Sequence, residues 1–321
     1  AAYLIRLVLT QNGVDVWRQF QTALILPLVV AVAVQSVSVL ITTWRWQMLL
    51  GVQGVPVRYW DLVSLSMIGL FFSSILPGAV GGDVLKMLYV VQHAPGRRTE
   101  AALTILVDRI MGLLGLCLVA VVSVLFSLRF LSQAPRDVQL ATLIVGAGSL
   151  AAFAFVLSVT MREHLQRLPG VSPLLGWLAR RLPEKLTASV GRIVRAIDLY
   201  REQPRVLLWA LGISVVTHVV AAWTVYLIGR AFHETNLPLW GYFLATQIAN
   251  TIAAIPITPN GFGGRDLVLA MFFRAGHVAP AQAGIIPAVN TLVILFWSLL
   301  GGVFFVFARA PRRIHVPLNP E

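Results

Sequence analysis

Long apolar runs, separated by shorter polar stretches, dominate the sequence. Five of these runs are continuous, and each is close to the roughly 20 residues that a helix needs to cross the hydrocarbon core of a bilayer. Charged residues gather in the stretches between the runs. The pattern therefore predicts five membrane-spanning helices. They are expected at residues 23–43, 103–128, 138–161, 206–228 and 282–307.

Two further apolar runs, Leu62–Val91 and Leu239–Phe273, are interrupted by proline and glycine. Each is too long for one ordinary helix and too short for two complete spans. Proline removes a backbone donor, so each interruption should be non-helical, which is tolerated at membrane depth only where protein or a water-filled cavity satisfies the freed groups. We therefore predict two re-entrant helical hairpins. The residues expected to break them are Pro77, Gly78, Gly81 and Gly82 in the first and Pro256, Pro259, Gly261, Gly263 and Gly264 in the second.

The distribution of basic residues predicts the topology. The segment 162–205 carries nine basic residues against four acidic ones, and the tail beyond residue 308 is basic until its final glutamate. Both should be cytoplasmic, because lysine and arginine concentrate in cytoplasmic loops. Two predicted spans, 206–228 and 282–307, already connect these two cytoplasmic segments. The second broken run lies between those spans, so it must return to the outer side from which it entered. The same reasoning applied backwards along the chain places both ends of the first broken run in the cytoplasm. Segment 162–205 is expected to include amphipathic helices on the cytoplasmic leaflet.

The two halves of the chain repeat one order of features: a span ending near an arginine, a broken run, and a span with an embedded polar residue. Pro77 and Asp108 are 31 residues apart, as are Pro259 and Asn290. Inverted repeats of this kind are common in secondary transporters. We predict one all-α integral-membrane domain, residues 1–321, folded as a polytopic helical bundle with two hairpins in an inverted repeat. Its parts are a first repeat at about 23–128, a linking span at 138–161, a cytoplasmic amphipathic segment at about 162–205 and a second repeat at about 206–308.

Composition agrees with a membrane environment. The chain is 58% hydrophobic and 12% charged, with a mean hydropathy of +0.81, so it lacks the polar surface that a protein of this size needs in water. The net charge of +12 is explained by loops facing anionic headgroups, which excludes nucleic acid as the expected partner. The single cysteine, Cys117, excludes a disulfide framework. Motifs for zinc, a nucleophile elbow or a phosphate-binding loop are missing, so no metal, cofactor or catalytic residue is expected.

Charged residues beside the helix breaks are the candidates for function, because a charge at a helix centre costs about 2.5 to 3.5 kcal/mol in a membrane. We expect Lys86, Arg109 and Arg265 to receive an anionic lipid headgroup at helix N-termini that follow the glycines. In the alternative interpretation, Asp83 with Arg109, or Asp108 with Lys86, forms a structural ion pair. His218, alone in a span, is expected to be a hydrogen-bonded core residue. The candidate headgroup-binding residues are Lys86, Arg109, Arg265, Asp83, Asp108, Asp266, Asn260 and Asn290.

Four motifs resemble a flippase-like integral-membrane family that includes the transmembrane region of lysylphosphatidylglycerol synthases. They are Arg45-Trp46, Leu76-Pro77-Gly78 with Gly82-Asp83, Asp108-Arg109 before Ile110-Met111-Gly112, and the Pro256–Asp266 segment. The resemblance covers about residues 23–307. It departs from the family pattern where Asp266 replaces a usual glutamate and Asn260 a common glycine.

The resemblance implies movement of modified phospholipids or polyprenyl-linked intermediates between leaflets. We therefore expect a flippase of the inner membrane whose partners are anionic or phosphate-bearing lipids. Two alternatives stay open. One is an integral-membrane transferase that modifies a lipid headgroup, with Asp83 or Asp108 as the base. The other is an accessory subunit of a lipid or envelope biosynthesis complex, in which the buried charges are structural.

Overall fold

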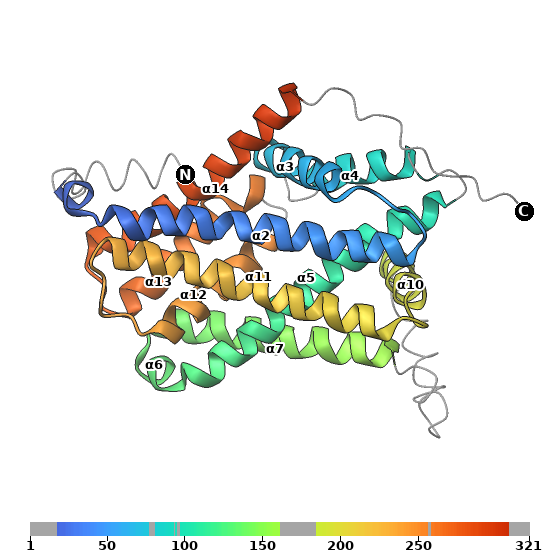
Figure 1. Ribbon diagram of the computed structural model, residues 1–321. Coiled ribbons are helices and arrows are strands. Elements are labelled where there is room, and N and C mark those ends of the chain that lie inside the picture. The colour runs from blue at the N-terminus through green and yellow to red at the C-terminus, as the bar shows by residue number, and fades with distance from the viewer. Residues whose placement is uncertain are drawn as a thin grey trace, which may run out of the picture.

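Five long helices form the body of the computed structural model, which describes residues 18–76, 81–92, 94, 97–160, 184–255 and 258–307 (Figure 1). They are long and apolar enough to span a membrane, and one lies at each of the five predicted spans. Between them lie shorter helices, and the described residues contain no strand. The long helices are α2 (Ile25–Val52), α5 (Arg98–Phe126), α7 (Arg136–Thr160), α11 (Pro204–Ala231) and α14 (Pro280–Phe307). The shorter helices are α3 (Tyr59–Ile75), α4 (Gly81–Gln92), α6 (Leu128–Gln133), α10 (Glu184–Asp198), α12 (Leu239–Ala254), the 3-10 turn η1 (Pro259–Gly261) and α13 (Gly264–Ala275).

Helices α2 and α11 lie side by side and antiparallel, and polar contacts fix both ends of this pair (Figure 1). At the end near α10, the Tyr200 hydroxyl donates to the Leu49 carbonyl at 2.9 Å. Burial raises the pKa of Tyr200, which keeps the hydroxyl protonated as a donor. At the end near α6, the Leu24 amide donates to the Ala231 carbonyl at 2.9 Å. We call these the α10 end and the α6 end of the bundle.

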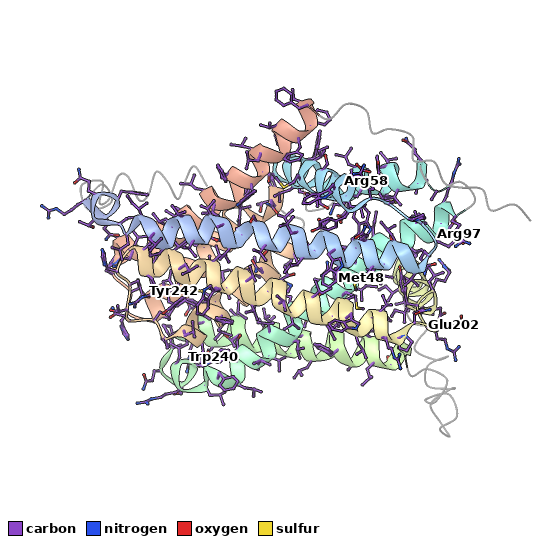
Figure 2. All side chains as sticks on the ribbon, in the orientation of Figure 1. Met48, Arg58, Arg97, Glu202, Trp240 and Tyr242 are labelled. Carbon is purple, nitrogen blue, oxygen red and sulfur yellow. The ribbon has the colours of Figure 1, made fainter. Side chains whose placement is uncertain are left out.

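Each broken apolar run folds into two short helices that pack together and return to one end of the bundle. The α3–α4 pair begins and ends at the α10 end, where Arg97 donates to the Gln53 carbonyl at 2.8 Å. The α12–α13 pair begins and ends at the α6 end, where the Asn236 side chain donates to the His277 carbonyl at 2.9 Å. Figure 2 shows Arg97 and Trp240 at these opposite ends.

The residues expected to break the two runs have different local roles. Gly81 and Gly82 are the first residues of α4, and Gly82 packs closely on α3, where its amide donates to Ser73 at 3.2 Å. A Cβ at Gly82 would overlap the Gly69 carbonyl. In the second run, Pro259 and Gly261 belong to η1, Gly263 caps α13 with φ 84°, and Gly264 begins that helix. Pro77, Gly78 and Pro256 lie outside the described residues.

Helix α10 has one apolar face and one basic face. Ala196 and Ile197 are buried on the apolar face, which packs against α5 and α7 at the α10 end. The sequence predicts an amphipathic helix in this segment, and α10 has that character. Its packing against α5 and α7 ties the basic segment to the helical body.

Glycine allows α14 to approach α3 closely. A Cβ at Gly301 would collide with the Met67 carbonyl, whereas one at Gly148 on α7 would meet no atom within 4 Å. We expect Gly301→Val to destabilise the protein by about 1–3 kcal/mol, because overpacking forces helices apart. Gly148→Val is the matched control. Thermal unfolding in detergent checks this, and equal melting temperatures for the two variants would contradict the close α3–α14 contact.

Candidate functional site

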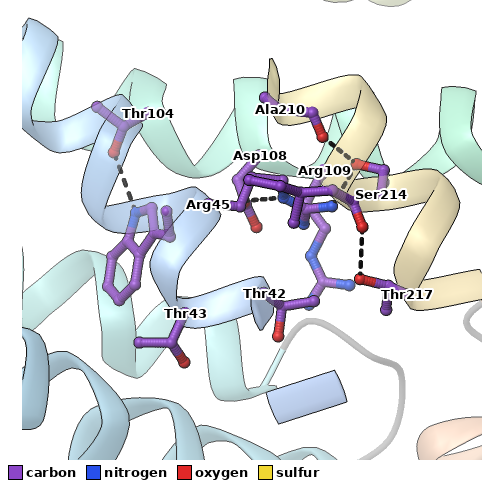
Figure 3. A network of polar contacts seen from close by, with 12 residues as sticks. Thr42, Thr43, Arg45, Thr104, Asp108, Arg109, Ala210, Ser214 and Thr217 are labelled. Atoms are coloured by element: carbon purple, nitrogen blue, oxygen red, sulfur yellow. Dashed lines mark hydrogen bonds and ion pairs between the residues drawn. The ribbon is translucent and has the colours of Figure 1, made fainter. Parts of the chain in front are cut away.

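A buried ion pair joins α2 to α5. The Arg45 Nε lies 2.7 Å from Asp108 Oδ1, and only 7% and 17% of the two side chains is exposed (Figure 3). The Nη1 of Arg45 also donates to the Ser214 hydroxyl on α11 at 2.6 Å. One guanidinium therefore links three long helices. The sequence identified Arg45 only as part of a motif, because the predicted span ended at residue 43 while α2 continues to Val52.

A second ion pair joins the first hairpin to α5. Arg109 donates to Asp83 on α4 through Nε at 2.5 Å and through Nη2 at 2.6 Å, and half of the arginine side chain is exposed. Of the two structural pairs weighed from the sequence, the one between Asp83 and Arg109 is present. Asp108 pairs with Arg45 and makes no ion pair with Lys86 in the part of the chain that the structure describes.

Lys86 lies near both ion pairs. Its ammonium is 5.2 Å from the centroid of the Trp46 ring, and it is within electrostatic reach of both carboxylates and both guanidiniums. The resulting charge cluster contains three cations and two carboxylates. It consists of Arg45, Asp83, Lys86, Asp108 and Arg109.

The second hairpin places Arg265 and Asp266 in the first turn of α13. Asp266 accepts from the Gly263 amide at 3.2 Å and from the Thr291 hydroxyl at 2.7 Å. The carboxylate therefore caps the helix N-terminus and ties it to α14. The short side chain of an aspartate reaches a backbone amide at this position.

Arg265 is a buried cation without an ion pair among the described residues. Only 7% of it is exposed, and its guanidinium lies 5.7 Å from the Phe262 ring. Its one side-chain contact within hydrogen-bond distance is Thr291 Oγ1, at 3.5 Å, and its Nε has no partner in the described chain. Asp266, the neighbouring charge, is engaged with Gly263 and Thr291 and makes no ion pair with it. A buried charge in this state needs a counter-charge.

A polar cavity of about 220 Å³ lies beside Arg265, which we call the Arg265 cavity. Its walls come from α2, α11, α12, α13 and α14, and the described residues that line it include no acidic side chain. Three more buried polar atoms in its lining lack a partner within the described chain: Ser38 Oγ, His218 Nδ1 and Thr246 Oγ1. Since buried polar atoms are almost always hydrogen-bonded, the cavity is suited to a polar, negatively charged guest. Its polar lining residues are Gln35, Ser38, Thr217, His218, Thr246, Asn250, Arg265 and Asn290.

Most of the candidate residues thus belong to one of two neighbouring sites, the Arg265 cavity or the charge cluster. Arg265 and Asn290 line the cavity, and Asp266 lies behind it, while the other predicted charges form the charge cluster. Asn260 donates to the Ser74 hydroxyl at 3.4 Å and connects the hairpins. On α11, Ser214 contacts the cluster and His218, one turn later, lines the cavity. Sequence reasoning missed Gln35 and Ser38 on α2 and Thr246 on α12, whose only signal is their position within apolar runs.

Five apolar helices of spanning length and charges buried among them define a multi-pass helical membrane protein. The family model for the lysylphosphatidylglycerol synthase TM region matches residues 1–302, so the chain belongs to that family. Among its relatives is a UPF0104 membrane protein of Methanothermobacter thermautotrophicus, 22% identical over 84% of this chain and 81% of the relative. Another is the UPF0104 membrane protein PH1989 of Pyrococcus horikoshii, also 22% identical, over 86% of this chain and 85% of the relative.

Proposed function

We propose that the protein is a lipid translocase that moves a phosphate-bearing lipid between the leaflets of the inner membrane. The observation that carries the proposal is Arg265, a buried cation without an ion pair in the described chain, beside a polar cavity free of acidic side chains. Guanidinium binds phosphate oxygens through strong charge-assisted hydrogen bonds. The headgroup enters this cavity while the lipid tails stay in the bilayer.

The arrangement of helices supports an inverted repeat. Between the halves, α3 of the first packs on α14 of the second, as α12 of the second packs on α5 of the first. Within each half, α4 packs on α5 as α13 packs on α14. The Asp83–Arg109 pair and the Arg265–Thr291 contact both join residues 26 positions apart, at matching places in the two halves. Repeats of this kind allow one half to rock against the other around a fixed site.

The proposed topology places the α10 end in the cytoplasm, because α10 and the segment before it are basic. The α3–α4 pair then re-enters from the cytoplasm and the α12–α13 pair from the outer side. This orientation brings the beginnings of α4 and α13 toward the membrane interior, where helix N-termini favour anions. The charge cluster would guide the headgroup from the cytoplasmic hairpin toward Arg265.

The lipid class follows from the same chemistry and from the family. The name of the family refers to lysylphosphatidylglycerol, a modified phospholipid. A polyprenyl-phosphate-linked intermediate offers the same phosphate to Arg265. Either substrate places one anionic group in the cavity and long apolar chains among the exposed leucines and phenylalanines of the helices.

The transferase alternative is weaker than the translocase. Its base would be Asp83 or Asp108, and each of these carboxylates accepts hydrogen bonds from an arginine. A catalytic base must lie within hydrogen-bond reach of the proton that it removes, and these carboxylates face arginine side chains instead. The accessory-subunit alternative predicts that Arg265 can be neutralised without selective loss of lipid, so the following experiment separates it from the translocase.

Native mass spectrometry of the purified protein with co-extracted lipid tests the proposal. We expect a phosphate-bearing lipid on the unmodified chain and its loss from Arg265→Gln. Arg274→Gln is the matched control, because Arg274 lies on the same helix α13 but is exposed. Retention of the same lipid in Arg265→Gln, with the protein folded, would contradict the proposal.

A further inference from the structure

His218 presents a hydrogen-bond acceptor to the Arg265 cavity. Its Nε2 lies 3.1 Å from the Gly112 carbonyl oxygen, which can only accept, so Nε2 carries the hydrogen. In the neutral ring, Nδ1 is then a lone-pair acceptor. This atom is buried, lines the cavity and has no partner within the described chain.

The charged groups near His218 are two arginines and one aspartate that is already paired. Arg45 acts on it from α2 and Arg265 lines the same cavity from α13. The remaining polar neighbours are uncharged: Gln247 on α12 donates to the His218 carbonyl at 3.3 Å, and Asn290 faces the cavity from α14. Asp108 on α5 is paired with Arg45. A third cation here would be repelled by two arginines.

The guest must therefore be anionic and must bring its own hydrogen-bond donor. An ammonium headgroup supplies a donor but would lie beside Arg265 with no carboxylate in the cavity lining. A phosphodiester supplies the charge, but its phosphate carries no hydrogen. A singly charged phosphate monoester supplies both on one group, because it keeps one P–OH beside its charged oxygens.

We propose that the Arg265 cavity selects a singly protonated phosphate monoester, with Arg265 binding the charged oxygens and His218 Nδ1 accepting from the P–OH. This inference rests on the proposed function and narrows its substrate to a lipid monophosphate. The cavity volume of about 220 Å³ accommodates a phosphate group, since one water takes up about 30 Å³ in the liquid. Free inorganic phosphate shares this chemistry, and the experiment below separates the two sources.

Two substitutions at one position isolate the acceptor. In His218→Gln, the amide nitrogen reaches the position of Nε2 and keeps the donor to Gly112, but the acceptor at Nδ1 is lost. In His218→Asn, the amide oxygen lies near the position of Nδ1 and keeps the acceptor, but the contact with Gly112 is lost. Any general effect of replacing the histidine is common to both variants.

The experiment measures lipid binding to the full chain in nanodiscs. Three probes are used. Phosphatidic acid is the monoester, phosphatidylglycerol with the same acyl chains is the diester, and inorganic phosphate is the free anion. We expect about a tenfold preference for phosphatidic acid, the effect of one buried hydrogen bond to a charged group. His218→Gln should abolish this preference for phosphatidic acid over phosphatidylglycerol, whereas His218→Asn should retain it.

Different failures have different meanings. Equal binding of both lipids by the unmodified chain, or an undiminished preference in His218→Gln, would overturn the selection of a monoester and leave the translocase proposal standing. Displacement of phosphatidic acid by an equal concentration of inorganic phosphate would overturn the assignment to a lipid. If neither lipid binds and Arg265→Gln changes nothing, the proposed function itself is wrong.

Discussion

Asp108→Asn is expected to destabilise the protein by about 3–5 kcal/mol, the cost of leaving one partner of a buried ion pair without its counter-charge. Arg45 would stay charged between α2, α5 and α11, with Ser214 as its remaining hydrogen-bond partner among the described residues. Asp83→Asn is the comparison, and we expect a smaller loss because its partner Arg109 is half exposed. Thermal unfolding of the purified variants in detergent measures both effects.

The double variant Arg45→Gln/Asp108→Asn provides a further check. Because it removes both charges, it should recover much of the stability that Asp108→Asn loses. Equal losses in Asp108→Asn and Asp83→Asn, or a double variant less stable than the single one, would contradict the structural role assigned to the Arg45–Asp108 pair.

Arg265→Gln is expected to slow lipid translocation by about 10- to 100-fold. A hydrogen bond to a charged group contributes about 1.5–3 kcal/mol, and each 1.4 kcal/mol corresponds to a factor of ten. Arg265→Lys should have an intermediate rate, because it keeps the charge but loses the planar, two-pronged donor. Proteoliposomes containing an acyl-labelled lipid and a membrane-impermeant quencher give the rate.

The control for this prediction is Arg274→Gln, which removes an exposed arginine from the same helix α13. It should transport lipid at the unmodified rate. Normal transport by a folded Arg265→Gln variant would exclude Arg265 as the headgroup contact.

The sequence predicted the spanning helices well because each is a local property, a run of apolar residues of sufficient length. It placed the end of the first span too early, at residue 43, because Arg45 follows there. Helix α2 continues to Val52 since Asp108, 63 residues away, neutralises that arginine. The pattern of apolar residues along the chain does not reveal a counter-charge so far away in the sequence.

The candidate site was predictable only in part for the same reason. Charges beside helix breaks are visible in the sequence, so Arg265 and the members of the charge cluster except Arg45 were named as candidates. The division into a charge cluster and a separate cavity depends on which helices meet. Ser38 and His218 come from helices far apart in the chain, and the sequence does not show that they line one cavity.

The leaflet and the mass of one lipid, followed together in proteoliposomes, test the central claim most directly. A phosphate-bearing lipid is placed in one leaflet, its appearance in the other is timed, and its mass is measured before and after. We expect the lipid to change leaflet in the presence of the protein and to keep its mass. The translocase proposal would be contradicted if the mass of the lipid changed. It would also be contradicted if the lipid equilibrated between the leaflets no faster than in protein-free vesicles.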